Sequence, residues 1–233
     1  MHYTAMYHGK LFFDTYAKGR SGLKIVDLGA QDVNGSLRTV APKDSNFVGA
    51  DFTPGKGVDV ILTDAYALPF EDESFDIVVT SSCFEHAELF WLSFNEALRI
   101  LRPDGLLFMN VPSNGAFHRY PVDCWRFYPD AGKALENWAR RSGFRPAMLE
   151  CFTGKQRHAL WNDYVAVYVK DEAQLSQYPR RIIDSYTEFT NGMVHGKDEV
   201  LNLERIPEDR RTFHWPWKIS KRFYRKAFKY DFL

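Results

Sequence analysis

The sequence LKIVDLGAQDVNGS, at residues 23–36, decides the fold class of this chain. Residues 25–28 form a short run rich in β-branched side chains, and the run stops at Gly29. Such a run predicts a buried parallel strand that passes directly into a turn. Two similar runs follow at residues 46–51 and 58–64. Together they predict an α/β sheet whose parallel strands end at one edge, where open α/β sheets place their binding sites.

An aspartate accompanies the end of each expected strand: Asp27, Asp51 and Asp64. Carboxylates at these points suit a nucleoside, because its hydroxyls and exocyclic amine are donors that need fixed acceptors. Asp51 follows the glycine turn by about 20 residues, a spacing at which an acidic side chain can accept from both ribose hydroxyls. Phe52 beside it could lie on an adenine face, and Ala65 after Asp64 would leave the edge of that ring uncrowded.

The loop at residues 29–35, GAQDVNG, distinguishes between two kinds of nucleoside cofactor. A glycine turn with a later acid is also the skeleton of a nicotinamide-binding fold. That fold uses G-x-G-x-x-G to bring its backbone close to a pyrophosphate, and the loop here lacks this pattern. A cofactor without phosphates does not require it, so the order of the acids favours S-adenosylmethionine.

With these motifs in this order, residues 23–169 resemble the class I S-adenosylmethionine-dependent methyltransferases, in particular the broad type 11 group. The resemblance implies a doubly wound, seven-stranded sheet that is mostly parallel and closes with an antiparallel hairpin at residues 147–152 and 164–169. It also implies two parts. Residues 1–170 would form a cofactor-binding domain that begins with a helix, and residues 171–233 a helical, basic and aromatic extension.

The resemblance further implies a set of cofactor-binding residues. Asp51 would hold the ribose, and the methionine end of the cofactor would meet the first loop and the backbone after the fourth strand. The positions carried over in this way are Asp27, Gly29, Ala30, Gln31, Asp51, Phe52, Asp64, Ala65 and Ser81. Gln31 stands where the family usually has glycine, so the contacts of residues 31–34 are left open.

A second informative segment, FHRYPVDCWRFYP at residues 117–129, follows the expected fifth strand. It begins at the carboxyl end of a strand and mixes flat aromatic rings with polar groups, as a ring-shaped polar acceptor such as a sugar requires. Asp123 and Arg126 could bind its hydroxyls. The rings that could cover it are Tyr120, Trp125, Phe127 and Tyr128. The segment is similar to segments in bacterial methyltransferases associated with surface-glycan assembly.

Methyl transfer to a hydroxyl requires a group that takes its proton. His118 is the main candidate, since imidazole titrates near neutral pH, with Asp123 as its orienting partner or as an alternative base. The structural alternative is an ion pair between Asp123 and Arg126, with His118 capping a turn. His86, at the exit of the fourth strand, is either a further candidate for proton transfer or a packing residue near the cofactor. The spacing of the histidines and cysteines is not typical of metal ligands, so the sequence predicts no metal.

Composition sets further bounds. The 233 residues contain 30 basic and 30 acidic side chains, so nothing global suggests a nucleic-acid partner. Three widely spaced cysteines argue against a disulfide framework and favour a reducing cytoplasm. Residues 1–20 lack the apolar core of a signal peptide, and no apolar run has the length of a transmembrane helix. An amphipathic helix over the cofactor mouth is predicted instead by Tyr3, Met6, Tyr7, Phe12 and Tyr16.

The segment at residues 214–230 is basic and aromatic. Ile219, Phe223, Ala227 and Tyr230 fall on one face of a helix, and basic residues flank this face. Such a helix suits an anionic membrane surface, which would place the protein peripherally at the inner face of the membrane. The alternative is that the helix docks on its own domain or on a second subunit of a homodimer, because Lys and Arg stems cover apolar surface well.

These observations favour an S-adenosylmethionine-dependent enzyme that methylates an oxygen of a small polar acceptor, such as a sugar in surface-glycan or secondary metabolism. A second hypothesis is a non-catalytic module of the same fold that works in assembly. The altered loop at Gln31 supports this hypothesis, and the retention of Asp51 and Asp64 opposes it. A nucleic-acid methyltransferase is the third hypothesis. Base-amine enzymes of that kind need an Asn/Asp-Pro-Pro-aromatic element after the fourth strand, where this chain has SSCF at residues 81–84.

Overall fold

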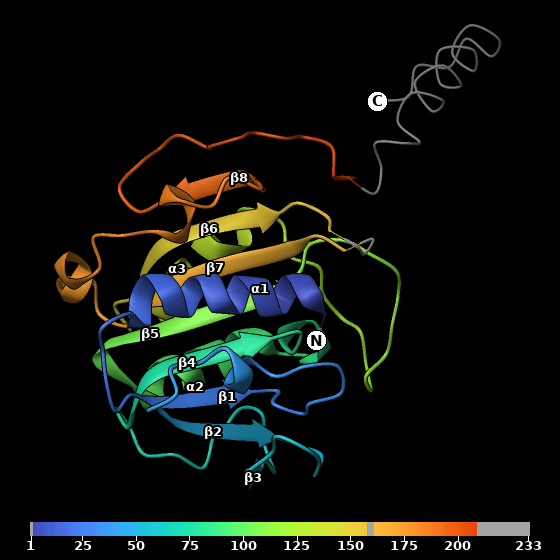
Figure 1. Cartoon of the computed structure of the whole chain (residues 1–233), viewed down its shortest axis with the longest axis vertical. Helices are drawn as coiled ribbons and strands as arrows, with labels where there is room; N and C mark the ends of the chain where they lie inside the picture. Colours follow the sequence, from blue (N-terminus) through green and yellow to red (C-terminus); the bar gives the residue numbers. More distant parts are fainter. Residues whose placement is uncertain (1, 158–160, 209–233) are drawn as a thin grey trace, which may run out of the picture.

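A computed structural model of the chain describes residues 2–157 and 161–208. Its centre is an eight-stranded sheet with the order β3-β2-β1-β4-β5-β7-β6-β8 (Figure 1). The strands are β1 (Lys24–Leu28), β2 (Asn46–Asp51), β3 (Val60–Ile61), β4 (Phe75–Ser81), β5 (Leu101–Pro112), β6 (Ala147–Gly154), β7 (Asp163–Val169) and β8 (Phe189–Val194). Strands β1 to β5 pair in parallel, and β7 pairs antiparallel with both β5 and β6. The strand order therefore reverses between β1 and β4, which creates a crevice at their carboxyl ends.

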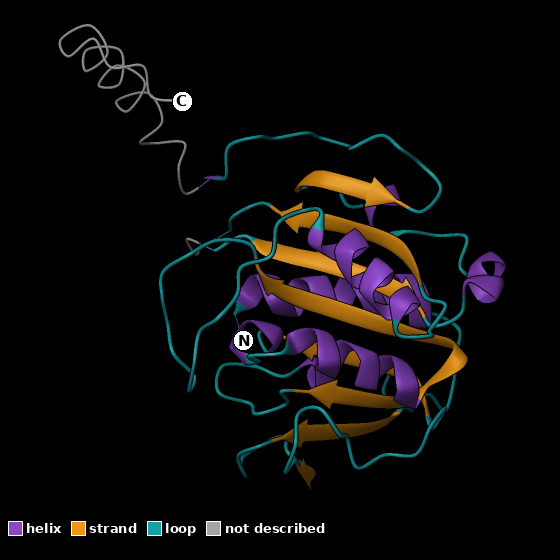
Figure 2. Cartoon of the chain, turned by 180° about the vertical axis from the view of Figure 1, so that it is seen from behind, coloured by secondary structure: helices purple, strands orange, loops and turns teal. Residues whose placement is uncertain are grey.

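Helices cover both faces of the sheet, so the molecule has three layers (Figure 2). One face carries α1 (Tyr3–Phe12) and the π-helical turn that continues it (Phe13–Ala17), and the other carries α2 (Phe90–Ile100) and α3 (Ala131–Arg141). Phe12 packs on Phe108 of β5, with ring centroids 4.8 Å apart. On the opposite face, Phe94 of α2 packs on Tyr168 of β7 at 5.0 Å. β4 is buried along its whole length, and its centre reads in the sequence as a short apolar run at residues 77–79.

The predicted class I architecture is confirmed, including the antiparallel pair β6 and β7. The sheet has eight strands rather than seven, because β8 pairs antiparallel with β6 and the hairpin does not close the sheet. The sequence of β8, FTNGMV, does not predict a strand, because its Asn-Gly pair is typical of a turn. Asn191 in this pair has a φ of 52°. Burial of Phe189 against Phe152, with centroids 5.8 Å apart, holds the strand on the sheet.

The predicted C-terminal extension is described as far as residue 208. Residues 171–208 contain two short 3₁₀ helices (Glu172–Gln177 and Ile182–Asp184) and β8, so this part is built onto the sheet. The basic and aromatic helix predicted at residues 214–230 lies outside the described residues. Of the helices in the described ranges, none has both the length and the apolar character needed to cross a membrane.

Helix α1 lies along the sheet beside β5 and β7 (Figure 1). Phe12 and Tyr16 on its predicted apolar side are buried, whereas Tyr3 is 61% exposed. His8 anchors the helix, because its ring nitrogens lie 3.2 Å from the side-chain oxygen of Asn110 and 3.3 Å from the hydroxyl of Tyr186. The helix thus covers more of the sheet face than of the cofactor mouth.

Candidate active site

A pocket of about 670 Å³ opens at the carboxyl edge of the parallel strands. Four strand ends contribute to its wall: Leu28 of β1, Asp51 of β2, Ser81 of β4 and Pro112 of β5. The pocket therefore occupies the crevice beside the point where the strand order reverses, the place at which open α/β sheets bind ligands. Its volume is typical of small-molecule sites.

Asp51 presents a carboxylate whose position is fixed by backbone donors. The N–H of Gln31 donates to Oδ2 and the N–H of Thr53 donates to Oδ1, both at 3.1 Å. The side chain lines the pocket, and each oxygen keeps lone-pair capacity for a ligand. The geometry is therefore suited to the ribose contact predicted for Asp51.

Of the other residues predicted to bind the cofactor, five line the pocket, whereas Asp27, Ala30 and Asp64 are not part of its wall. Those that line the pocket are Gly29, Gln31, Phe52, Ala65 and Ser81. Phe52 is 52% exposed, so its ring is available to pack against a base. Ala30 is buried, and its N–H donates to the carbonyl of Ala50 at 3.2 Å. Asp64 accepts a hydrogen bond from the N–H of Tyr66 at 2.7 Å. Ala30 and Asp64 thus shape the loops that border the pocket.

Asp27 lies in β1, two residues before the turn, and is 1% exposed. Neither of its carboxylate oxygens has a hydrogen-bond partner in the described parts of the chain. Burial disfavours the charged form of a carboxyl group, and it raises the pKa of Asp27 to about 8. A positive charge placed nearby would favour the ionised form of Asp27.

Gly29 has a φ of 84°, a conformation that residues with a Cβ rarely adopt. A Cβ at this position would lie 2.7 Å from the Cβ of Cys83, in the loop after β4. Glycine is therefore required here by the turn and by the close packing of two loops of the protein.

The segment at residues 117–129 folds over the pocket from the end of β5, and residues 118–121 line it. The hydroxyl of Tyr120 donates a hydrogen bond to the side-chain oxygen of Gln31. This bond joins the segment predicted to hold the acceptor to the loop predicted to hold the cofactor, and it supplies a contact for Gln31 that the sequence left open.

Asp123 anchors this segment. Its side chain is 1% exposed and accepts from Nη1 and Nη2 of Arg126 at 2.6 and 2.8 Å. It also accepts from the backbone N–H of His118 at 2.7 Å. These bonds, above all those from Arg126, lower the pKa of Asp123 to about 2. A carboxylate of such low basicity is a poor base, so the geometry favours a positioning role, with the ring Nδ1 of His118 lying 3.5 Å from its Oδ2.

The four rings predicted to cover an acceptor have different environments. Tyr120 lines the pocket. Phe127 is 2% exposed and packs in the core on Phe90, with centroids 4.9 Å apart, so the expectation that it covers an acceptor is wrong. Trp125 packs on the same Phe90 at 5.4 Å, and neither it nor the exposed Tyr128 lines the pocket. Aromatic side chains of this segment thus fasten it to α2, which the sequence pattern does not distinguish from ligand binding.

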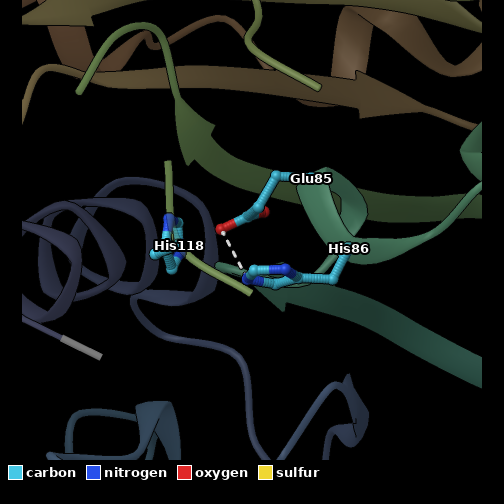
Figure 3. Close-up of side chains that lie close together, drawn as sticks. All are labelled: Glu85, His86 and His118. Atoms are coloured by element: carbon cyan, nitrogen blue, oxygen red, sulfur yellow. Dashed lines mark ion pairs between the residues drawn. The ribbon is translucent and has the colours of Figure 1, made fainter. Parts of the chain in front are cut away.

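Glu85, His86 and His118 form a cluster on the wall of the pocket (Figure 3). Glu85 and His86 belong to the 3₁₀ helix Phe84–His86 that follows β4, and His118 comes from the segment after β5. Oε1 of Glu85 is 3.8 Å from Nε2 of His86. The two imidazole rings meet edge to face with centroids 4.9 Å apart. The structure therefore brings together both predicted catalytic histidines and adds a carboxylate.

Burial controls the charge of two members of this cluster. Glu85 is 1% exposed, and burial raises its pKa to about 8. Burial also lowers the pKa of His86. Nδ1 of His86 is hydrogen-bonded to the carbonyl oxygen of Val122, which can only accept. Nδ1 therefore carries the proton of the neutral ring, and Nε2 presents its lone pair on the side of Glu85.

Glu85 and Trp161 are among the residues of the pocket wall that sequence reasoning missed. Glu85 stands beside His86 at a strand exit, and that pairing is the signal that could have indicated it. Trp161 comes just before β7, and its ring lies 5.0 Å from that of His118 and 5.6 Å from the guanidinium of Arg126. Trp161 reaches the pocket only because β7 returns antiparallel to β5, so no local pattern marks it.

The chain is also similar in sequence to known proteins. Residues 28–109 match the model of a family described as a methyltransferase domain. The 2-methyl-6-phytyl-1,4-hydroquinone methyltransferase 2 of Oryza sativa subsp. japonica is 30% identical over 112 residues, which are 45% of this chain and 32% of that protein. The ubiquinone/menaquinone biosynthesis C-methyltransferase of Dinoroseobacter shibae is 33% identical over 81 residues, 33% of this chain and 32% of that protein. The chain spans about a third to a half of the length of the curated relatives it matches.

A solved structure shares the fold. The 1,6-didemethyltoxoflavin-N1-methyltransferase of Burkholderia thailandensis, solved with S-adenosylhomocysteine and 1,6-didemethyltoxoflavin, aligns with a TM-score of 0.54 and 15% identity. The alignment covers 72% of this chain and 79% of that protein. At this level of identity the likeness concerns the fold.

Proposed function

Because the chain belongs to the class I S-adenosylmethionine-dependent methyltransferases, we propose that it binds this cofactor in the pocket and transfers the methyl group to a small polar acceptor. The observation that carries the proposal is the carboxylate of Asp51. It is held by two backbone N–H groups at the end of β2 and lines the pocket. An acid fixed at this place suits the two hydroxyls of a ribose.

The residues around Asp51 suit the remainder of the cofactor. Phe52 exposes a ring for the adenine, and Ala65 adds a small side chain to the wall. Asp27 stands two residues before Gly29 with an unpartnered carboxyl group, and the ammonium group of the methionine part would favour its ionised form. When bound, S-adenosylmethionine supplies an electrophilic methyl group on a positively charged sulfur.

We place the acceptor between residues 118–121 and the cluster of Glu85, His86 and His118, and we propose that a hydroxyl oxygen of a sugar or similar molecule is methylated. The support is the polarity of this side of the pocket, which includes two imidazoles and Arg119. Holding acceptor and cofactor in line can supply much of the rate of a transfer between two reactants. His118 and His86 face the same volume and are positioned to assist removal of the hydroxyl proton.

The relatives favour a second candidate, methylation of a carbon on a quinol-type ring. The rice relative is named for a hydroquinone and the Dinoroseobacter shibae relative for C-methylation in quinone biosynthesis. Tyr120 and Trp161 line the pocket with aromatic rings, which suit a planar acceptor. The two candidates differ in their products, because one yields a methyl ether and the other a ring methyl group.

The test is a titration with S-adenosylhomocysteine followed by a transfer assay with methyl-labelled cofactor. Two panels of acceptors, nucleotide sugars and quinols, are offered to the full chain, and NMR of the product identifies the atom that carries the methyl group. Binding together with transfer supports the proposal. Binding without transfer to either panel would favour the non-catalytic module, and a protein that does not bind S-adenosylhomocysteine contradicts the proposal altogether.

For residues 214–230 we propose a peripheral contact with an anionic membrane surface. The support is the sequence pattern of one apolar helical face flanked by Lys and Arg. The alternative is a role in covering apolar surface on the domain itself or on a second copy of the chain.

A further inference from the structure

We propose that Glu85, His86 and His118 bind a divalent first-row transition-metal cation on the wall of the pocket. Each side chain offers one ligand atom, and these three atoms all lie within 4.8 Å of one another. Figure 3 shows the carboxylate of Glu85 directed toward the imidazoles of His86 and His118. Two imidazoles and one carboxylate form a ligand set that proteins use for zinc and for other first-row metals.

Glu85 supplies an independent reason to expect a cation. Its side chain is 1% exposed, and its Oε2 has no hydrogen-bond partner in the described parts of the chain. Its Oε1 lies 3.8 Å from Nε2 of His86, beyond hydrogen-bond distance. The guanidinium of Arg126 is engaged by both carboxylate oxygens of Asp123. Oε2 is therefore a buried acceptor without a hydrogen-bond donor in the described parts of the chain, and a cation beside it would pair with it.

His86 is oriented as a metal ligand. Its Nδ1–H donates to the carbonyl oxygen of Val122, which leaves the lone pair of Nε2 on the side of Glu85. A backbone carbonyl that fixes the far nitrogen of an imidazole is the usual support of a metal-bound histidine.

The three ligands can close onto one ion. Metal–ligand distances of about 2.1 Å would bring the ligand atoms to roughly 3–3.5 Å from one another. The side chain of His118 is 40% exposed, so it can rotate to make up the difference. Its backbone N–H stays attached to Asp123, which keeps the residue at the site. Three protein ligands leave coordination positions for an acceptor, as in catalytic metal sites.

The role of the cation rests on the proposed function. A hydroxyl oxygen of the acceptor that binds the cation becomes more acidic, since a cation stabilises the oxyanion. Its proton passes to solvent, an electron pair of the oxygen forms the new bond to the methyl carbon, and the bond from sulfur to that carbon breaks. S-adenosylhomocysteine is the second product. His86 and His118 then serve as ligands, and the acceptor needs no imidazole base.

The experiment is a Co²⁺ titration of the untagged full chain after treatment with a chelator, followed by visible ligand-field absorption and equilibrium dialysis. We expect one Co²⁺ per chain at the cluster. Glu85→Gln keeps the shape of the side chain but removes its charge, and we expect it to weaken Co²⁺ binding at least tenfold. His118→Ala should do the same. The matched control is His195→Ala, because His195 follows β8 and is absent from the pocket wall, and its removal should leave the titration unchanged.

Circular dichroism establishes that each variant is folded. If Glu85→Gln proves unstable, Glu85→Asp replaces it. This variant retains the charge on a shorter side chain and should bind Co²⁺ with altered absorption. Absence of saturable Co²⁺ binding, or equal affinity in wild type and His118→Ala, overturns the metal site. Titration of the same metal-free samples with S-adenosylhomocysteine separates the two proposals. Cofactor binding without Co²⁺ binding contradicts the metal site and leaves the proposed methyltransferase function standing. Co²⁺ binding without cofactor binding supports the metal site and contradicts the proposed function.

Discussion

The hydroxyl of Tyr120 donates a hydrogen bond to the side-chain oxygen of Gln31, a residue 89 positions earlier in the chain. Both residues line the pocket. The bond ties the segment after β5 to the loop after β1, so the two sides of the pocket that were predicted to hold acceptor and cofactor are in direct contact. A substitution at either residue should therefore affect the binding of both cofactor and acceptor.

Tyr120→Phe removes this bond and keeps the ring. We expect the affinities for cofactor product and for acceptor each to fall about threefold to tenfold, since a hydrogen bond contributes roughly 0.5–1.5 kcal/mol. Calorimetry and steady-state kinetics measure the two effects. Tyr128→Phe is the control, because Tyr128 is exposed outside the pocket wall. Equal losses in the two variants would show that the tie to Gln31 does not couple the two sides.

Asp51→Ala should weaken binding of S-adenosylhomocysteine about tenfold to more than a hundredfold. The reason is the loss of a charged acceptor for the ribose hydroxyls, which costs roughly 1.5–3 kcal/mol. Asp44→Ala is the control, since Asp44 is exposed, is not part of the pocket wall and accepts from the N–H of Gly22 at 3.3 Å. Unchanged affinity in a folded Asp51→Ala variant would rule out the ribose contact.

His118→Ala should lower turnover by roughly 10²–10⁴ and leave the affinity for cofactor product nearly unchanged. This loss is expected whether His118 assists proton removal directly or holds a cation that does. Asp123→Asn should act more mildly on turnover, because Asp123 positions the segment through Arg126 and the N–H of His118. Full turnover in His118→Ala would contradict both roles. Loss of cofactor binding in this variant would instead indicate that His118 has a structural role.

Asp27 should make the folded state less stable as the pH rises. Its pKa is raised to about 8 in the folded chain, against an ordinary value of 3.8. Between these two values the folded state keeps a proton that the unfolded state has lost, so the free energy of unfolding falls by about 1.4 kcal/mol per pH unit at most and levels off above the folded pKa.

Asp27→Asn removes this titration and keeps the size of the side chain. Urea unfolding at pH 5, 6, 7 and 8 should therefore show a flatter pH dependence for the variant than for the wild type. Asp44→Asn, at the exposed surface, serves as the comparison. Parallel pH profiles for wild type and Asp27→Asn would mean that burial does not hold the proton on Asp27.

Truncation after Glu208 tests the segment at residues 214–230. Glu208 is kept because it accepts from the side chain of Asn162 at 2.6 Å and from the backbone N–H of Gln156 at 2.8 Å. We expect the full chain to bind anionic vesicles in a salt-sensitive way, since each Lys or Arg near such a surface contributes about 1 kcal/mol. The truncated chain should lose vesicle binding and keep cofactor binding.

The outcome separates the two roles considered for this segment. A truncated chain that aggregates or changes its oligomeric state would show that the segment covers apolar surface on the domain or on a second copy. Absence of binding between the full chain and anionic vesicles at low salt would contradict the membrane proposal.

Local sequence determined the strand, turn and acid pattern of the first half of the sheet. A strand buried on both faces is mostly apolar, and the turn at the end of β1 uses Gly29 with positive φ. Asp51 follows from the same logic, because the end of a parallel strand is where a ligand meets the protein. Each of these features depends on neighbours within a few positions, so the sequence displays it directly.

Only the tertiary structure decided which side chains meet at the pocket. The sequence does not show that Phe127 turns into the core while Tyr120 faces Gln31, since both are aromatic residues of one irregular segment. It did not reveal β8, whose pairing with β6 depends on burial rather than on strand propensity. Glu85 and His118 lie more than thirty positions apart and come together because β4 and β5 are adjacent and parallel, so their exits share one edge of the sheet. Such proximity is a property of strand order, which no local pattern of residues records.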